Sequence, residues 1–240
     1  MTASELDIVL PCFNPPPGWT KRILEIASLL ENELGIQINW ILVNDGSSKK
    51  LPQEQVRLLG KGLKSFQFID YLPNQGKGYA LRQGVAASKA SICIFTDIDF
   101  PYTLESFIGI YDKLVAQEAD IVVGINEESY YQHLPLVRVL VSKSLKWMIK
   151  TFLRISITDT QRGLKGFNQK GKAIFLETTI NRYLADLEFI FLAEQKNDVS
   201  LKAHTVYLNP GVEFSQVSLK ILIKEGFNFL NVFLNSRLRR

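Results

Sequence analysis

Cysteine and histidine are scarce in this chain, which has two of each among its 240 residues. Two cysteines cannot build the disulfide framework of a small secreted protein, and Cys12 and Cys93 both fall in expected strands. We therefore expect buried, reduced thiols. His133 and His204 are too few and too far apart in the sequence for a zinc site, so ordinary surface or core roles are expected.

Long apolar segments are lacking as well. The chain has no run of about 18 uncharged apolar residues, which a membrane-spanning helix would need. Residues 1–7 do not have the charged and then apolar regions of a signal peptide. We therefore expect a cytoplasmic protein that is soluble or bound peripherally at the inner face of the cell membrane.

The signatures of several other classes are missing. There is no Gly-x-Ser-x-Gly, no Walker sequence and no zinc-spaced cysteine pair, so hydrolase and ATPase interpretations lack support. Low-complexity tracts and Gly/Ser-rich or Pro-rich linkers are also absent, and 46% of the residues are hydrophobic, which predicts one folded domain. The net charge is only +4, without the basic stripe and stacking aromatics of a nucleic-acid binder. Two basic stretches still favour an anionic partner: Arg138, Lys143, Lys146, Lys150 and Arg154, and then Arg237, Arg239 and Arg240.

Short apolar segments alternate with helical patterns through the first half of the chain. The predicted strands are 7–12, 39–43, 66–70, 92–96 and 121–123, and the predicted helices are 21–34, 53–60, 77–88 and 104–118. This alternation predicts an α/β fold with a mostly parallel central sheet and helices on both faces.

The alternation stops after residue 125, which divides the predicted domain 1–240 into halves 1–125 and 126–240. The second half contains an amphipathic stretch at 134–152, a short segment at 163–167, a helix at 183–195, a strand at 201–208 and a final helix at 217–238. Lysines and large apolar residues such as Trp147 and Phe152 make 134–152 typical of a helix on an anionic membrane surface. Packing on its own domain and formation of a homodimer are the alternatives.

Two carboxylates one residue apart, Asp97 and Asp99, follow the apolar run 91–96 and precede Pro101. Side chains two residues apart in extended chain point the same way, so both carboxylates can reach one divalent cation. At the carboxyl end of a parallel strand, such a pair predicts a Mg²⁺ or Mn²⁺ site. A solvated turn is the alternative, because Asp-x-Asp alone is a weak signal.

Three further segments carry groups suited to a nucleotide. Pro11 and Asn14 end the first strand, where amides can grip a base or ribose, although an ordinary strand exit looks the same. Asp45 precedes Gly46 and can accept a hydrogen bond from a base or a ribose; a capped turn is the alternative. Residues 76–78, Gly-Lys-Gly, open a helix whose free amides and lysine suit phosphate oxygens, unless the segment is a plain glycine-rich helix start.

The ordered set of these segments resembles family 2 glycosyltransferases of the GT-A fold, and most closely the polyprenyl-phosphate sugar transferases. The resemblance covers most of residues 6–220 and rests on Val-Leu-Pro-Cys-Phe-Asn at 9–14, Val-Asn-Asp-Gly-Ser-Ser at 43–48, Asn-Gln-Gly-Lys-Gly at 74–78, Thr-Asp-Ile-Asp at 96–99 and Asp-Thr-Gln-Arg-Gly at 159–163. It implies an inverting hexosyltransferase of cell-envelope synthesis that moves a sugar from a nucleotide-diphosphate sugar to a polyprenyl (dolichyl-type) phosphate. Transfer to a sugar hydroxyl of a surface polysaccharide, or an inactive nucleotide-sugar-binding protein, are the alternatives.

The resemblance also implies roles for individual residues. The donor side consists of Pro11, Asn14, Asp45, Gly76, Lys77 and Asp97, with Asp99 on the metal directly and Asp97 on the metal or the ribose. The acceptor side consists of Asp159, Arg162, Asp186 and Glu188. A hydroxyl acceptor would need one of these carboxylates as general base, whereas a lipid phosphate arrives ionised and needs cations such as Arg162, Lys165, Arg138 and Lys143.

The chain departs from the family pattern in three respects, one of which is that we expect no C-terminal pair of transmembrane segments. Pro15, Pro16 and Pro17 follow Asn14, where family members usually carry an acid. Gly124, Ile125 and Asn126 stand where the lipid-phosphate subgroup commonly has Gly-Ser-Arg, an arginine expected to meet phosphate. Arg162, at a position that is often uncharged, is the residue we expect to compensate.

Overall fold

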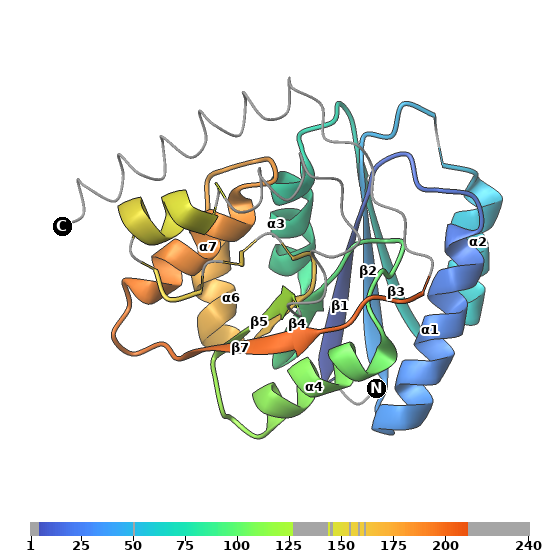
Figure 1. Cartoon of the computed structure of the whole chain (residues 1–240). Helices are drawn as coiled ribbons and strands as arrows, with labels where there is room; N and C mark the ends of the chain where they lie inside the picture. The colour runs from blue at the N-terminus through green and yellow to red at the C-terminus, as the bar shows by residue number, and fades with distance from the viewer. Residues whose placement is uncertain are drawn as a thin grey trace.

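One seven-stranded sheet organises the protein, in the strand order β3-β2-β1-β4-β6-β5-β7 (Figure 1). The structure, a computed structural model, describes residues 5–49, 51–126, 144, 146–153, 155–157, 159–160 and 162–210, apart from the side chains of Asn126 and Phe152. The strands are β1 (Leu6–Cys12), β2 (Ile38–Asp45), β3 (Ser65–Tyr71), β4 (Ile92–Phe95), β5 (Ile121–Asn126), β6 (Lys165–Phe167) and β7 (Leu201–Val206). All neighbours pair in parallel except β6, which is antiparallel to β4 and β5.

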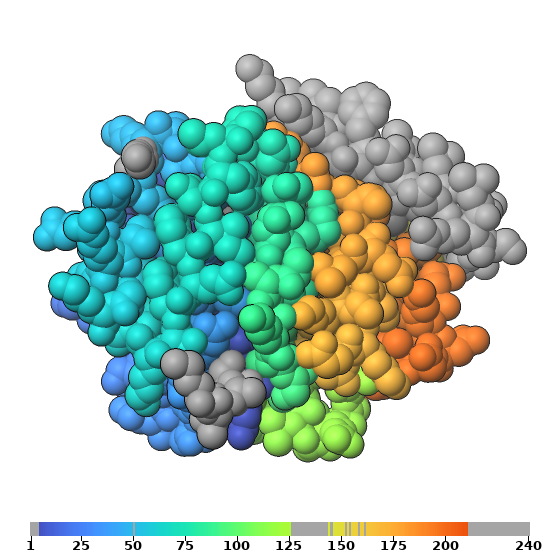
Figure 2. Space-filling model, turned by 180° about the vertical axis from the view of Figure 1, so that it is seen from behind, coloured from blue at the N-terminus to red at the C-terminus, as the bar shows by residue number. Residues whose placement is uncertain are grey.

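Helices cover both faces of the sheet, as the sequence predicts (Figure 1). They are α1 (Trp19–Leu34), α2 (Gln53–Gly62), α3 (Lys77–Ala87), α4 (Leu104–Val115), α6 (Gln169–Leu176) and α7 (Ala185–Glu194), with a π-helical turn at Ile149–Leu153. The helices α1, α2 and α4 lie on one face, and α3, α6 and α7 on the other. Seen from behind, α3 and α6 lie side by side at the surface (Figure 2).

Alternation along the strands divides the core in two. Leu6, Ile8, Leu10 and Cys12 of β1 pack with α1, α2 and α4, whereas Val9 packs with α3 and α7. Successive side chains of a strand point to opposite faces, so a continuous apolar run can serve both layers. Cys12 and Cys93 are buried and free, and burial raises the pKa of each thiol to about 12.

The strands and helices predicted between residues 7 and 123 are all present, with ends shifted by no more than three residues. The predicted segments at 163–167, 183–195 and 201–208 correspond to β6, α7 and β7. The helix α6 was not predicted, although Asn168 gives it a side-chain cap by accepting hydrogen bonds from the amides of Lys170 (2.9 Å) and Gly171 (3.3 Å).

The amphipathic stretch 134–152, apart from 144 and 146–152, and the predicted helix 217–238 lie outside the described residues. The division into halves 1–125 and 126–240, the homodimer and the interfacial helix therefore stay predictions. Within the described ranges, no helix is long and apolar enough to cross a membrane.

The strand order reverses beside β1. The chain moves outward from β1 through β2 to β3 and then returns to place β4 on the other side of β1. In open α/β sheets, ligands bind at such a reversal, just outside the carboxyl ends of the strands. Asn14 follows β1, and Asp97 follows β4, so the fold brings predicted site residues to this edge.

Candidate functional site

The carboxylate of Asp97 forms an ion pair with the ammonium group of Lys77. Asp97 comes from the loop after β4, and Lys77 is the first residue of α3. The Lys77 side chain is 21% exposed and that of Asp97 is 37% exposed, so solvent reaches the pair. Burial opposes the charge on Lys77, but Asp97 and then Asp186 outweigh it and raise the pKa of Lys77 above its ordinary range.

Asp99 is exposed at the same edge. Partial desolvation, and then the charge on Asp97, raise the pKa of the Asp99 carboxyl, while Lys77 acts in the opposite direction. The two carboxylates therefore repel each other, and a cation between them would relieve that repulsion. In the described part of the chain, no third His, Cys, Asp or Glu joins them in a cluster able to hold a metal ion.

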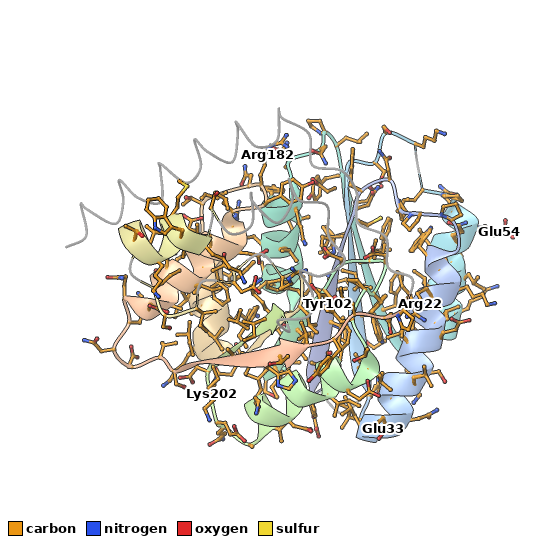
Figure 3. All side chains as sticks on the ribbon, in the orientation of Figure 1. Arg22, Glu33, Glu54, Tyr102, Arg182 and Lys202 are labelled. Atoms are coloured by element: carbon orange, nitrogen blue, oxygen red, sulfur yellow. The ribbon has the colours of Figure 1, made fainter. Side chains whose placement is uncertain are left out.

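Gly163 lets the segment before β6 pass directly against Asp97. A Cβ at Gly163 would lie 2.2 Å from Oδ2 of Asp97, so any larger residue would displace the carboxylate. The Gly163 amide donates a hydrogen bond of 3.1 Å to the hydroxyl of Tyr102, which Figure 3 labels in the middle of the molecule. Desolvation, followed by the charge on Asp97, raises the pKa of Tyr102 to about 12.

A buried ion pair, Lys165 with Asp186, lies beside the first. The Lys165 side chain is 0% exposed, its ammonium is 3.0 Å from Oδ1 of Asp186, and it also donates to the carbonyl of Arg162. Burial lowers the pKa of Lys165, and Asp186 opposes that effect. The prediction that Lys165 meets a lipid phosphate is wrong, because its ammonium group is enclosed by the protein.

Asp45 anchors the loop that precedes α3. Its buried carboxylate accepts four hydrogen bonds, from the Tyr71 hydroxyl (3.0 Å), the Asn74 side chain (2.7 Å) and the amides of Gln75 and Gly76 (2.8 Å each). These four donors use the acceptor capacity of the carboxylate. The structure therefore gives Asp45 a role in positioning the loop, while the predicted contact with a base stays a prediction.

The predicted phosphate cradle of free amides at 76–78 is closed by a neighbouring segment. A Cβ at Gly76 would lie 2.4 Å from the carbonyl oxygen of Asn181, and one at Gly78 would lie 2.5 Å from that of Ile180. The Gly76 amide donates to Asp45, and the Tyr79 amide donates to the Asn181 carbonyl at 3.2 Å. The expectation of a free amide is thus wrong for Gly76, while Tyr79 lies just outside the predicted segment. The glycines permit close packing of residues 180–182 on α3.

Glu188 and Arg82 hold that neighbouring segment in place. Glu188 accepts hydrogen bonds from the amides of Thr179 and Ile180, both at 2.8 Å, and from the Thr179 hydroxyl at 2.7 Å. Arg82 of α3 donates to the Ile180 carbonyl at 2.7 Å and to the side chain of Asn181. In Figure 3, Arg182 marks the end of this segment above α3. Glu188, predicted as a catalytic carboxylate, is bound by its own chain.

Asn14 connects the ends of β1 and β2. Its amide donates to the Ser47 hydroxyl at 2.9 Å, and its side-chain oxygen accepts from the amide and the hydroxyl of Ser48, both at 3.0 Å. Its φ of 47° lies in the left-handed region, which asparagine tolerates. Pro11 is half-buried within β1, opposite Val43. The contacts of Asn14 and Pro11 with a nucleotide stay predictions.

Asp159 brings two cations together on the acceptor side. The ammonium group of Lys146 is 3.0 Å from Oδ2 of Asp159, and Nε of Arg162 is 4.0 Å from Oδ1. The side chains of Asp159 and Arg162 are only 13% and 12% exposed. Arg162 also acts electrostatically on Tyr102, which links this group to the surroundings of Asp97.

The predicted residues therefore fall into two groups. Asp97, Asp99, Lys77, Asp186 and Arg162 lie within one network of charges, with Asp159 at its side. Asp45, Asn14, Gly76 and Glu188 shape the loops around it. Sequence reasoning missed Tyr102 and Arg82, and no local pattern marks either residue.

Comparison with solved structures identifies the class of fold. Mannosyl-3-phosphoglycerate synthase from Rubrobacter xylanophilus superposes with a TM-score of 0.70 at 13% identity, over 98% of this chain and 74% of that one. Glucosyl-3-phosphoglycerate synthase from Mycobacterium tuberculosis, in complex with Mn²⁺, UDP and glucosyl-3-phosphoglycerate, gives 0.64 at 14% identity, over 97% and 80%. The architecture is the GT-A fold of nucleotide-sugar glycosyltransferases.

The sequence comparison then gives the family. Residues 7–172 match the model of glycosyl transferase family 2, and the chain belongs to that family. It is similar to the dolichyl-phosphate beta-glucosyltransferase of Saccharomyces cerevisiae, at 25% identity over 210 residues and 80% of this chain. The human dolichyl-phosphate beta-glucosyltransferase is 24% identical over 205 residues, 79% of this chain. The chain spans 63% of the length of each of these two relatives.

Proposed function

We propose that this protein transfers a sugar from a nucleotide-diphosphate sugar to a polyprenyl phosphate, with inversion at the anomeric carbon. The similarity to dolichyl-phosphate beta-glucosyltransferases supports the donor and acceptor classes. The choice of acceptor rests on one observation. Each carboxylate that was predicted as a general base already forms an ion pair or hydrogen bonds within the protein. In the reaction, a phosphate oxygen of the acceptor bonds to the anomeric carbon, the bond to the donor diphosphate breaks, and the nucleoside diphosphate leaves.

Asp97 and Asp99 are the residues that would hold a divalent cation. Their donor atoms are carboxylate oxygens that solvent can reach, and no third His, Cys, Asp or Glu of the described residues joins them. This set suits Mg²⁺ or Mn²⁺, which keep several waters and bind through one or two carboxylates together with substrate phosphates. The cation would neutralise charge on the departing diphosphate. The presence of Mn²⁺ together with UDP in the Mycobacterium tuberculosis structure supports a divalent cation beside the donor diphosphate.

Lys77 is the cation of the chain that would bind the donor diphosphate. Its ammonium group is at the same edge as Asp97 and remains charged, because its pKa is raised. The segment 180–182 packs on the start of α3 and fixes the backbone from which the Lys77 side chain extends. The ammonium group is therefore kept within reach of this edge, and positioned charge is the main means by which phosphate groups are bound and stabilised.

The acceptor side favours an acceptor that needs no general base. Asp186 is paired with buried Lys165, Glu188 accepts three hydrogen bonds, and Asp159 is paired with Lys146 and Arg162. A sugar hydroxyl would need one of these carboxylates to take its proton. A phosphate monoester has lost most of its second proton near neutral pH and is already nucleophilic. Lys146 and Arg162 are the cations that would position it.

A polyprenyl phosphate is held in a membrane, so an enzyme that uses it acts at the membrane surface. We propose that the segment around Trp147 contacts that surface. Trp147 is 62% exposed and lies between Lys146 and Lys150, a combination typical of an interfacial helix. We place that surface on the cytoplasmic side, where nucleotide sugars and anionic lipids meet.

The test is transfer of label from radioactive UDP-glucose or GDP-mannose, with Mn²⁺, to a short-chain polyprenyl phosphate or to an oligosaccharide. Label that partitions into the organic phase only when polyprenyl phosphate is present supports the proposal. Label that appears only on the oligosaccharide supports the hydroxyl acceptor instead. Binding of a nucleotide sugar without any transfer would point to an inactive binding protein.

A further inference from the structure

Lys77 occupies a carboxylate that the proposed cation also needs. Its ammonium group is paired with Oδ1 of Asp97, one of the two residues that would hold the metal ion. The other oxygen, Oδ2, faces the backbone of Gly163 and has no room on that side. A cation that binds Asp97 must therefore compete with Lys77.

We propose that Lys77 changes partner during donor binding: it neutralises Asp97 before the donor binds and moves to the donor diphosphate when a divalent cation takes Asp97. This inference rests on the proposed function, because it needs a diphosphate. The exchange makes metal and diphosphate binding mutually dependent. Binding of either one favours the other, and the coupling is reciprocal.

The surroundings of Lys77 support an exchange rather than a fixed pair. The Lys77 side chain keeps 21% of its surface exposed and the Asp97 side chain 37%, unlike the buried pair of Lys165 and Asp186, in which Lys165 is fully enclosed. A four-carbon stem with a compact charge lets the ammonium group move while the start of α3 stays fixed.

The exchange predicts that Mn²⁺ binds weakly when no diphosphate is present, because an ammonium group already neutralises the Asp97 carboxylate. Lys77→Met removes that competitor. Mn²⁺ binding alone should then strengthen by about fivefold or more, which is the range of ordinary coupling between sites. In the same variant, UDP should strengthen Mn²⁺ binding less than it does in the unaltered protein.

The experiment measures free Mn²⁺ by electron paramagnetic resonance during titration of the whole protein, with and without UDP. Lys64→Met is the matched control, because it removes a lysine from another ion pair, with Glu31 at 2.8 Å, outside the charge network around Asp97. Lys77→Arg keeps the charge and should keep weak binding of Mn²⁺ alone. Circular dichroism and melting temperature check that every variant is folded.

Two outcomes contradict the exchange. Equal or weaker Mn²⁺ binding by Lys77→Met than by the unaltered protein would show that Lys77 does not compete. An equal gain in the Lys64→Met control would show a general effect of net charge. Failure of UDP to bind the unaltered protein under any condition would instead contradict the proposed function, while the titrations with Mn²⁺ alone still decide whether Lys77 competes.

Discussion

The ammonium group of Lys165 lies 3.0 Å from Oδ1 of Asp186, and the Lys165 side chain has no exposed surface. The pair joins β6 to the first turn of α7, next to the ion pair of Lys77 with Asp97. An enclosed charge without its partner is costly, so each member depends on the other.

We expect Lys165→Met to destabilise the protein by about 3–5 kcal/mol, because it leaves the Asp186 carboxylate buried and uncompensated. The double variant Lys165→Met with Asp186→Leu should recover most of that loss. Urea unfolding of the two variants and the unaltered protein measures both changes. A double variant no more stable than Lys165→Met would show that the pair itself is not the cause.

Asp45→Asn should loosen the loop before α3. The carboxylate accepts hydrogen bonds from the backbone amides of Gln75 and Gly76 and from the side chains of Tyr71 and Asn74. The NH₂ group of an asparagine side chain cannot accept these hydrogen bonds and would face one or more of the donors. The expected loss is about 2–3 kcal/mol of unfolding free energy. Faster hydrogen exchange at the amides of Gln75 and Gly76 should accompany it. Exchange unchanged at both amides would contradict this role.

Gly76→Ala should be more harmful than an ordinary glycine substitution. Gly76 has a φ of 109°, and a Cβ there would lie 2.4 Å from the Asn181 carbonyl oxygen. Backbone strain and the collision together should cost about 2–4 kcal/mol. Gly35→Ala is the control, because Gly35 has a φ of 66° with nothing within 4 Å of its Cβ position. Similar melting temperatures for the two variants would contradict close packing at Gly76.

Acid should selectively weaken the contact between β5 and β7. Desolvation acts to raise the pKa of Asp120, but hydrogen bonds from Ser200 and Asn168 outweigh it and lower the pKa. A lowered pKa gives stability that is fully present above the unfolded value of about 3.9 and is lost as pH falls through the folded value. Asp120→Asn should therefore be about 2 kcal/mol less stable than the unaltered protein at pH 6, with the difference shrinking toward pH 3. A difference that stays constant with pH would exclude ionisation as the cause.

Local patterns predicted the elements of the first half because each strand is a short apolar run beside a recognisable helix. They also placed Asp97, Asp99 and Lys77 at one edge, since the carboxyl ends of parallel strands meet there. They did not predict that Asp45 accepts hydrogen bonds from the amides of Gln75 and Gly76, which are 30 and 31 positions away in the sequence. Nor did they predict the burial of Lys165. That depends on a three-residue antiparallel strand inserted between β4 and β5, and no sequence period marks an insertion of this kind.

The central claim is that Asp97 and Asp99 hold the cation that binds the donor diphosphate, and calorimetric titration of UDP in the presence of Mn²⁺ tests it most directly. We predict that the unaltered protein and the control Asp112→Asn, which changes an exposed residue of α4, bind UDP more tightly with Mn²⁺ than without it. Asp99→Asn, folded by circular dichroism, should lose that dependence and at least tenfold in affinity, which is about 1.4 kcal/mol. Retention by Asp99→Asn of the same Mn²⁺-dependent affinity would contradict the account.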